Sequence, residues 1–524
     1  MDWDLMKKTV MNWLIMPLLL LSSAAVVEGA SAKPKAGGTL NMGIYRDLEL
    51  MNPLVATRSI DEDLRTLMFE PLLALDEKDR VRPHLAESWE VSKDGRLYTF
   101  KLRRGVKFHD GQEMTAEDVE FAADYTMNPK NGAFGTNQLA LVHRVEASDR
   151  YIVKFYLKTA TPAFLSSLTQ ITTFSVIPKG SLEEGQKPAA YPPGTGPFRF
   201  VEWQPKQRLI FERFDGYWGP KALLERVVMT SILDDTARIT ALRTGDVDLI
   251  ERTPREWVRQ IVDGKLKEIG YEKAPHSSFR RIIFNAAQPP FDNKKARQAV
   301  AHAINRKEIL DAAYFGLGEP NDQKFPKGNP WYIEGVRAPS YNLAKARALL
   351  KDAGYKGEPV ELLIIQSAAE QAEASALQAQ LKKIGIPIQL AMMDAAAANS
   401  RFRRGEFTLR FSGTSLFTDP SPMYGPGLVC EPDLKKRATN SSGYCDKEME
   451  ALLKKADSEL DAAKRRALFR QVVGKLFDDV PELFLGFVPE TFAFRRHVKG
   501  FTTNDDGNFQ WSGGGLSRTW LDKQ

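Results

Sequence analysis

The chain has 524 residues, and dividing that length by roughly 150 residues per domain predicts about three structural units. Its formal charge is only +6, from 73 Lys and Arg against 67 Asp and Glu, and the two signs are interspersed along the chain. A nucleic-acid-binding protein gathers basic residues on one face, so the charge pattern argues against that class. A hydrophobic content of 43% with 27% charged residues is typical of a folded globular protein.

The N-terminal residues have the pattern of a signal peptide. Lys7 and Lys8 precede an apolar run, residues 10–21, which is too short to span a membrane comfortably. Ala30-Ser31-Ala32 then supplies the small side chains that signal peptidase accepts. The pattern predicts that residues 1–32 are removed near Ala32 after export, which places the mature protein in the periplasm.

Two alternatives to this interpretation stay open. The apolar run is also compatible with an N-terminal anchor helix that is never cleaved. Acidic Asp2 and Asp4 are unusual ahead of the lysines, so translation could start at Met6 and not at Met1. No cysteine lies near the cleavage site, which argues against a lipid anchor.

The first third of the mature chain is rich in predicted strands. Residues 89–91 and 97–102 flank Lys93-Asp94-Gly95, which is a hairpin signal. Residues 151–157 and 208–214 are further β-rich runs. A helix is expected to begin after Thr115, because Asp118 three residues later completes a variant of the capping box.

Strands and helices alternate from about residue 280 onward. The expected order begins with a strand at 281–284 and a helix that starts at Asp292. It continues with a helix from Asn305 to Gly316, a helix at 342–353, strands at 360–365 and 386–390 around a helix containing Leu377, and two closing helices at about 449–460 and 468–476. The strand–helix–strand segment predicts a parallel pair with a right-handed crossover. A β-rich front and an α/β rear together predict two lobes.

Cys430 and Cys445 are the two cysteines of the sequence. Export places them in an oxidising compartment, and the Gly, Pro, Asn and Ser residues around them indicate irregular chain. We therefore expect a local disulfide, which would stabilise the protein by roughly 3 kcal/mol in the chain-entropy model. Two unrelated buried thiols are the alternative, and metal binding is a poorer one because no histidine lies near them.

Short segments distributed along the chain are similar to segments of a known protein family. They are Phe69-Glu70-Pro71-Leu72-Leu73, Ala86-Glu87-Ser88-Trp89, Phe108-His109-Asp110-Gly111 with Thr115-Ala116-Glu117-Asp118-Val119, Gly194-Thr195-Gly196-Pro197-Phe198, Phe284-Asn285, Pro290-Phe291-Asp292 and Arg297-Gln298-Ala299-Val300. Each is weakly specific alone. In their order, from about Gly38 to the C-terminus, they resemble the family 5 extracellular solute-binding proteins, the dipeptide, oligopeptide and nickel receptors of ABC importers.

The resemblance implies an α/β fold of two lobes joined by a hinge, the type II periplasmic-binding-protein fold with an extra inserted domain. Lobe I would comprise residues 33–60, 191–271 and 485–524, the inserted domain residues 61–190, and lobe II residues 272–484. Members of this family close on a solute and deliver it to an ABC permease in the inner membrane. The expected function is therefore that of a binding receptor, a monomer without cofactor, metal or nucleic acid.

No group of residues in the sequence meets the requirements of a catalytic site. His109 and Asp110 are adjacent and precede Gly111, which indicates a turn and favours a structural role over a catalytic pair. The six histidines have no metal-ligand spacing, and the glycines at 513–515 lack the Lys-Ser/Thr of a phosphate loop. A secreted hydrolase is the remote alternative, because paired carboxylates leave no sequence signature.

The ligand is less well defined by the sequence than the class of protein. In peptide-binding members of the family, an Asp three residues before an Asp-Pro pair holds the ammonium group of the peptide. Here the pair is Asp419-Pro420, and Leu416 stands at the corresponding position, where it cannot neutralise a cation. Arg281 stands where many relatives have an aromatic residue, and an arginine in the cleft would favour a carboxylate or phosphate. Together these departures weaken the case for an ordinary dipeptide, and they leave modified peptides, opine-like acids and oligosaccharides open as ligands.

We predict that Arg281, Asp419 and Tyr424 line the space between the lobes. Asp419 could replace the missing acid after a small shift, and Tyr424 offers an aromatic face and a hydroxyl group. The structural alternatives are that Arg281 pairs with a neighbouring acid and that Tyr424 only packs under its loop. Arg281 and Asp419 are not expected to be core residues, so replacing them is expected to leave folding intact.

Overall fold

The computed structural model describes residues 33–48, 51–55, 62–76, 80–182, 191–414, 418–431, 440–505, 507–508, 510–511 and 514–523. The expected signal peptide, residues 1–32, and Leu416 lie outside the described residues. Every described helix and strand belongs to the structural unit Lys35–Gln524.

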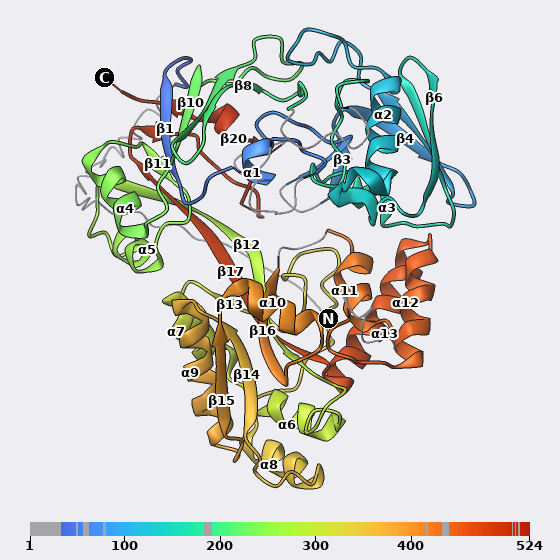
Figure 1. Ribbon diagram of the computed structural model, residues 1–524, viewed down its shortest axis with the longest axis vertical. Coiled ribbons are helices and arrows are strands. Elements are labelled where there is room, and N and C mark those ends of the chain that lie inside the picture. The colour runs from blue at the N-terminus through green and yellow to red at the C-terminus, as the bar shows by residue number, and fades with distance from the viewer. Residues whose placement is uncertain are drawn as a thin grey trace, which may run out of the picture. The chain divides into compact units, whose positions relative to one another are not determined.

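One mixed sheet, with eleven strands among the described residues, runs through most of this unit (Figure 1). Its strand order is β15-β14-β16-β12-β17-β11-β1-β10-β9-β8, and β13 pairs with β17 outside this row. The strands are β1 (Thr39–Ile44), β8 (Phe198–Gln204), β9 (Arg208–Arg213), β10 (Arg226–Ser231), β11 (Leu249–Ile250), β12 (Ile269–Phe284), β13 (Glu319–Pro320), β14 (Val360–Ile365), β15 (Ile388–Met393), β16 (Leu409–Thr414) and β17 (Glu482–Arg495). The pairs in β15–β14–β16 and in β11–β1–β10 are parallel. The pairs that join these two groups through β12 and β17 are antiparallel, as are the β10–β9–β8 pairs at one end of the row.

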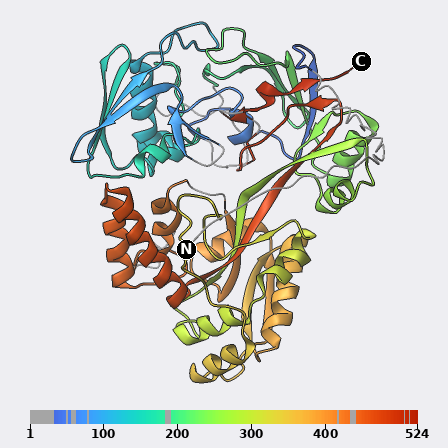
Figure 2. The same ribbon diagram turned by 180° about the vertical axis from the view of Figure 1, so that it is seen from behind.

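The middle of the sheet consists of two long antiparallel strands, β12 and β17, which Figures 1 and 2 show side by side. Residues 269–274 of β12 pair with 490–495 of β17, beside β11. Residues 279–284 of β12 pair with β16, and residues 278–283 pair with β17 on the other side. The register shifts between Ala274 and Ser278, where the hydroxyl of Ser277 accepts from the Glu490 amide at 2.8 Å and donates to the Val488 carbonyl at 3.2 Å. The two strands are therefore continuous, but their ladder is interrupted at one place.

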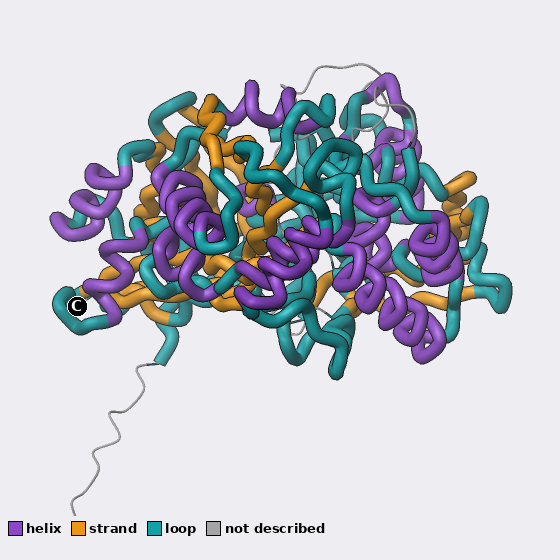
Figure 3. Tube along the Cα trace, turned by 90° about the horizontal axis from the view of Figure 1, so that it is seen from below, coloured by secondary structure: helices purple, strands orange, loops and turns teal. Residues whose placement is uncertain are grey.

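Helices and smaller sheets complete the unit, and Figure 3 shows helices and strands interspersed throughout it. The helices are α1 (Glu62–Arg65), α2 (Ala116–Met127), α3 (Phe164–Ser167), α4 (Asp235–Thr244), α5 (Arg255–Val262), α6 (Lys294–Ala303), α7 (Arg306–Tyr314), α8 (Leu343–Asp352), α9 (Ala368–Lys382), α10 (Ala395–Arg403), α11 (Pro420–Leu428), α12 (Lys447–Ser458) and α13 (Ala462–Asp479). A four-stranded sheet has the order β4 (Ala86–Val91), β5 (Leu97–Leu102), β7 (Ile152–Leu157), β6 (Val142–Asp149). Two-stranded sheets pair β2 (Leu73–Leu75) with β3 (Val81–Pro83), β18 (Val498–Lys499) with β21 (Trp520–Leu521), and β19 (Gln510–Trp511) with β20 (Gly514–Gly515).

Most elements expected from local sequence signals are confirmed. The hairpin is β4–β5, and the backbone amide of Thr115 donates to Asp118 Oδ2 at 2.7 Å at the start of α2. The strand–helix–strand segment is β14–α9–β15, with β14 and β15 parallel as predicted. The predicted start of α6 is off by one residue, because Asn293 and not Asp292 caps the Lys295 amide.

Hydrophobic side chains form separate clusters along the sheet. One cluster joins β1, β9 and β10 to the four-stranded sheet, and a second lies between the β12–β16–β14 strands and α6 to α9. A third cluster packs α11, α12 and α13 against one face of β12 and β17 through Phe279, Tyr424, Phe469 and Phe484. This third cluster provides the apolar surroundings of the site described next.

The disulfide expected from the sequence is present in the structure. Cys430 and Cys445 are bonded, with their Cα atoms 4.5 Å apart, so the expected bridge joins the end of α11 to the start of α12. No helix within the described ranges has the length and apolarity needed to cross a membrane.

Candidate functional site

A cluster of three charged side chains lies where β12 and β17 pair beside α11. Arg281 on β12 donates from Nη1 to Glu482 Oε2 at the start of β17, and Lys324 Nζ lies 2.7 Å from Glu482 Oε1. The side chains of Lys324 and Glu482 are 2% and 7% exposed, whereas that of Arg281 is 20% exposed. Of the three members of this Arg281–Glu482–Lys324 cluster, Arg281 is thus the one that solvent, and a solute, can reach.

The position of Arg281 follows from the strand that carries it. Successive side chains on a strand point to opposite faces, so neighbouring Arg280 turns away and binds Glu373 from the α9 side, with its Nε 2.8 Å from Oε1. A second register shift, between Arg280 and Arg281, adjusts the pairing with β17 at this point. Opposite it, Gly486 has φ +149°, and an added Cβ would lie 2.1 Å from the carbonyl oxygen of Glu319. Only glycine allows β13 to approach β17 here.

Lys324 is fixed in place by more contacts than Arg281. It donates to the Met423 carbonyl at 2.8 Å, and its ammonium lies 4.9 Å from the ring centroid of Tyr424 and 5.4 Å from that of Phe484. Burial lowers the pKa of Lys324 to about 8, although the charge of Glu482 opposes this shift. Burial alone would raise the pKa of Glu482, but Lys324 and Arg281 outweigh it, so the pKa is lowered and the carboxylate stays ionised.

Tyr424 lies on the buried side of this cluster and not at its accessible edge. Its ring contacts Phe325 and Phe469 at centroid distances of 6.2 and 6.1 Å, and it is 1% exposed. Burial raises the pKa of its phenol well above the ordinary value. The structure therefore brings Arg281 and Tyr424 together around Lys324, with Tyr424 packed in the hydrophobic cluster behind it.

Asp419 belongs to a different ion pair. Both of its carboxylate oxygens lie 2.7 Å from Arg465 guanidinium nitrogens, and Oδ1 also accepts from the Ser421 amide at the start of α11. Asp419 and Arg465 are both buried. The expectation that Asp419 is not a core residue is wrong, because a carboxylate can be buried when an arginine pairs with it in the bidentate mode.

Sequence reasoning missed Lys324 and Glu482, which complete the cluster. Glu482 opens an otherwise apolar run that continues through Val488, and a charged residue in such a run implies a buried partner. That signal was present, but it does not identify the partner. Lys324 stands in a polar segment between Asn321 and Phe325, which has no recognisable pattern.

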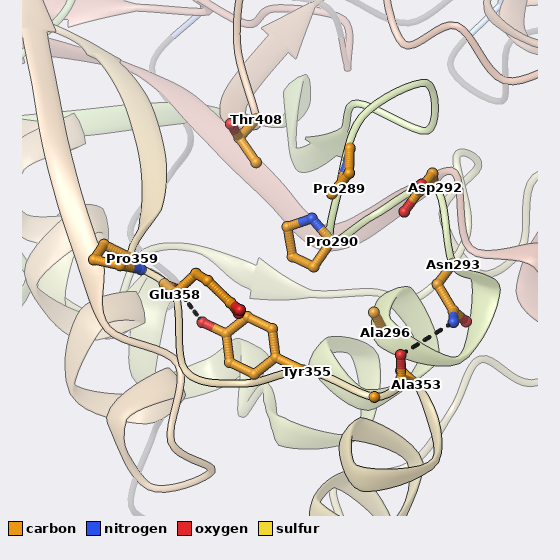
Figure 4. A pocket seen from close by; sticks show the side chains of 11 residues that line it. Pro289, Pro290, Asp292, Asn293, Ala296, Ala353, Tyr355, Glu358, Pro359 and Thr408 are labelled. Atoms are coloured by element: carbon orange, nitrogen blue, oxygen red, sulfur yellow. Dashed lines mark hydrogen bonds between the residues drawn. The ribbon is translucent and has the colours of Figure 1, made fainter.

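A groove of about 690 Å³ lies beside α6 and the end of α8 (Figure 4). Figure 4 shows Asn293 reaching the carbonyl oxygen of Ala353, 3.4 Å away, and the hydroxyl of Tyr355 donating to the carbonyl of Glu358. These bonds stabilise the local turns. No member of the charged cluster lines this groove.

A second cavity, of about 270 Å³, contains the buried carboxylate of Glu70 among aromatic residues. Glu70 accepts from the Tyr217 hydroxyl at 2.8 Å and the Trp218 indole at 2.9 Å, and His84 Nε2 lies 3.1 Å away. Burial alone would raise the pKa of Glu70, but His84 and these hydrogen bonds lower it. Its oxygens already have internal partners, so this carboxylate serves the packing of the segments around it.

His109 has the structural role that its sequence context indicated. Its Nε2 lies 3.0 Å from the Gly196 carbonyl, and its backbone amide donates to the Gly194 carbonyl at 2.9 Å. Burial lowers the pKa of His109 to about 4, so the ring is neutral. In the part of the chain that the structure describes, no group of His, Cys, Asp and Glu side chains is arranged to hold a metal ion.

Comparison with known proteins identifies the class of the chain. The family model for bacterial extracellular solute-binding proteins, family 5 (middle), matches residues 80–432. The glutathione-binding protein GsiB of Pectobacterium atrosepticum is 28% identical over 477 residues, which cover 89% of this chain and 92% of that protein.

Two solved structures extend the comparison to the fold. DppA from Helicobacter pylori, in complex with the peptide STSA, is 26% identical with a TM-score of 0.78 and covers 94% of this chain and 99% of its own. The PBP AgaA from A. tumefaciens R10, in complex with agropinic acid, is 29% identical with a TM-score of 0.77 and covers 93% and 99%. The chain therefore belongs to the bacterial extracellular solute-binding proteins of family 5, which are two-lobed α/β receptors and not enzymes.

Proposed function

We propose that this protein captures a small peptide or peptide-like solute in the periplasm and delivers it to an ABC permease of the inner membrane. The observation that carries the proposal is the similarity to GsiB, named as a glutathione-binding protein, over nearly the whole length of both chains. The peptide held by DppA of H. pylori supports the same ligand class. Both ligands are short chains with amide groups and free carboxylates, which suit a site of mixed polar and apolar character.

Capture works through a hinge in β12 and β17. Lobe I comprises residues 33–60, 191–271 and 485–524, the inserted domain residues 61–190, and lobe II residues 272–484. The interrupted ladder between Ala274 and Ser278 lies between the two points where the chain passes from one lobe to the other, 271/272 on β12 and 484/485 on β17. A change of a few backbone angles there turns one lobe against the other. A ligand that contacts both lobes favours the closed state by the free energy of those extra contacts.

Among the candidate site residues, Arg281 makes the direct ligand contact. Its side chain is the most exposed of the three in the charged cluster. Tyr424 and Asp419 shape the site from the buried side, through the packing of Lys324 on Tyr424 and through the Asp419–Arg465 pair at the start of α11.

An opine-like acid is the second candidate ligand. The structure of AgaA in complex with agropinic acid supports it, since that protein is 29% identical to this chain, and an accessible arginine suits an acid without an ammonium group. Oligosaccharides remain a third ligand class, with no comparable support.

Calorimetry and thermal unfolding of protein purified without denaturation test this proposal. Glutathione, a tetrapeptide and an opine acid are added separately, and the recovered solutes are analysed. The expected result is saturable binding of a peptide, with stabilisation of about 2.7 kcal/mol at a hundredfold excess over Kd and no chemical change in the solute. Binding of the opine acid alone would select the second candidate. Binding of none of the three, or conversion of the solute, would overturn the proposal.

Export and assembly form a separate part of the proposal. The mature protein begins at or near Lys33 and acts as a monomer that does not bind nucleic acid. Intact-mass measurement of periplasmic extracts and light scattering of the purified protein check these points. Retention of residues 1–32 in the exported protein would contradict cleavage near Ala32.

A further inference from the structure

The Arg281–Glu482–Lys324 cluster has one carboxylate and two cations, and this imbalance calls for an explanation. Lys324 and Arg281 both stabilise the ionised carboxylate of Glu482, through their charges and through hydrogen bonds. Lys324 is buried and is held by Glu482, by the Met423 carbonyl and by two aromatic rings. Arg281 makes a single hydrogen bond in the cluster, from Nη1. Among the described residues no acceptor is found for its Nε or Nη2.

The burial of the three side chains indicates which of the two cations can leave Glu482 for a ligand. If Lys324 were absent, a ligand that drew Arg281 away would leave Glu482 buried without a counter-charge, which is strongly unfavourable. With Lys324 in place, Glu482 keeps a cation whether or not Arg281 turns to a ligand. Arg281 also has the more exposed side chain of the two cations, and the planar fork of a guanidinium matches a carboxylate in the bidentate mode.

We propose that Lys324 is a positioning residue, which neutralises Glu482 so that Arg281 is released to bind a free carboxylate of the ligand. The proposal rests on the function proposed above and narrows its ligand class to solutes with an accessible carboxylate. A peptide C-terminus and an opine acid share this chemistry, and the experiment includes both. Lys324 does not touch the ligand; it acts through Glu482.

Matched ligand pairs test the role of Arg281. A tetrapeptide is compared with its C-terminal amide, and an opine acid with its methyl ester, by calorimetry at pH 7. The wild-type protein is expected to bind the acid of one pair at least about tenfold more tightly than the neutral partner, as a charged hydrogen bond predicts. The Arg281→Met variant is expected to lose that preference. The pair that shows it identifies the source of the carboxylate.

Variants of the two buried partners test the role of Lys324. Lys324→Met is expected to weaken binding of the acid by about tenfold or more, because Glu482 then holds Arg281 alone. The double variant Lys324→Met/Glu482→Gln carries neither charge and is expected to restore the affinity to within about threefold of wild type. Lys307→Met, at an exposed position paired with Asp311, is the control and leaves binding unchanged.

The outcomes separate this inference from the proposed function. Equal binding of acid and neutral partner by the wild-type protein overturns the carboxylate site while the receptor function stands. If the double variant has an intact unfolding transition but still binds the acid weakly, Lys324 has only a structural role. If Lys324→Met does not fold, the double variant and the matched ligand pairs still test the proposal. Binding of no probe by the wild-type protein overturns both proposals.

Discussion

Single residues in this protein are constrained mainly by buried charge. Asp419 and Arg465 are both buried and meet through two hydrogen bonds of 2.7 Å. Lys324 is equally buried and depends on Glu482. Each pair is tolerated because its members are present together, and removal of one leaves an uncompensated charge in a medium of low polarity.

The Asp419–Arg465 pair leads to a prediction on stability. Asp419→Asn is expected to lower the free energy of unfolding by about 3–5 kcal/mol, because Arg465 stays buried without a counter-charge. Urea denaturation followed by circular dichroism measures the change. Asp311→Asn is a matched control at the surface, where its pair with Lys307 contributes less than about 0.5 kcal/mol. An Asp419→Asn variant with the same free energy of unfolding as wild type would contradict a stabilising role for the Asp419–Arg465 pair.

Lys324 leads to a prediction on pH dependence. Burial lowers its pKa from the ordinary 10.5 to about 8, so between these values the unfolded chain binds a proton that the folded protein does not. Stability from this residue therefore rises as the pH increases from about 8 to 10.5, by at most about 3 kcal/mol, and is lowest below pH 8. Urea unfolding of wild type and Lys324→Met across this range should diverge with pH. Parallel curves would show that the Lys324 ammonium is not destabilised by burial.

Helices in this protein are fixed by hydrogen bonds at their ends, and strands by their pairing in the sheet. The first turn of α2 is held by Asp118, which accepts from the Thr115 amide at 2.7 Å and from the Lys179 amide at 2.8 Å. Thus one side chain both starts the helix and fastens a distant segment to it. The pairing of β12 with β17 also depends on one side chain. Where the ladder is interrupted, the Ser277 hydroxyl makes hydrogen bonds to the β17 backbone in place of the missing backbone–backbone bonds.

Replacing Asp118 tests its double role. Asp118→Ala is expected to destabilise the protein by about 1–2 kcal/mol, because two backbone amides lose their acceptor in a buried place. Neighbouring Glu117→Ala is the control in the same turn, since Glu117 and Lys179 form a largely exposed ion pair that contributes little. Thermal and urea unfolding measure both variants. Equal effects of the two substitutions would contradict a specific role for Asp118.

At the scale of the whole molecule, the two ends of the sheet are joined through β12 and β17. Near the interrupted ladder, His276 on β12 lies close to acidic side chains from two distant segments. Its Nδ1 is 3.0 Å from Asp505, and its Nε2 is 3.7 Å from Glu319 on β13. The hinge that we propose in these two strands would allow the parts on either side to move as bodies while their own cores stay packed.

Fluorescence energy transfer tests closure directly. Cys430 and Cys445 are bonded to each other, so dyes can be attached through Lys206→Cys near β8 and Lys382→Cys at the end of α9. Saturating ligand is expected to change the transfer efficiency with the same Kd as calorimetry, because binding and closure are linked. The pair Lys351→Cys and Lys382→Cys, both near the β14–β15 end of the sheet, serves as the control and stays constant. Binding without any change in transfer between Lys206→Cys and Lys382→Cys would exclude closure.

The sequence by itself determined the class of protein and most of the local structure. The family resemblance, the capping residues of α2 and α7, the β14–α9–β15 unit and the Cys430–Cys445 bridge all depend on residues close together in the chain or on the order of short segments. Such signals are local, because caps, helix periodicity and short loops involve neighbours in sequence.

Only the tertiary structure decided which charges meet. Lys324 and Glu482, like Asp419 and Arg465, lie far apart in the chain and are brought together by the packing of α11, α13, β12 and β17. It also decided that Asp419 is buried and that Arg281 is the accessible member of its cluster. The physical reason is that burial and ion pairing depend on contacts between distant segments, and a charged residue in the sequence looks the same whether its partner is water or a buried counter-charge.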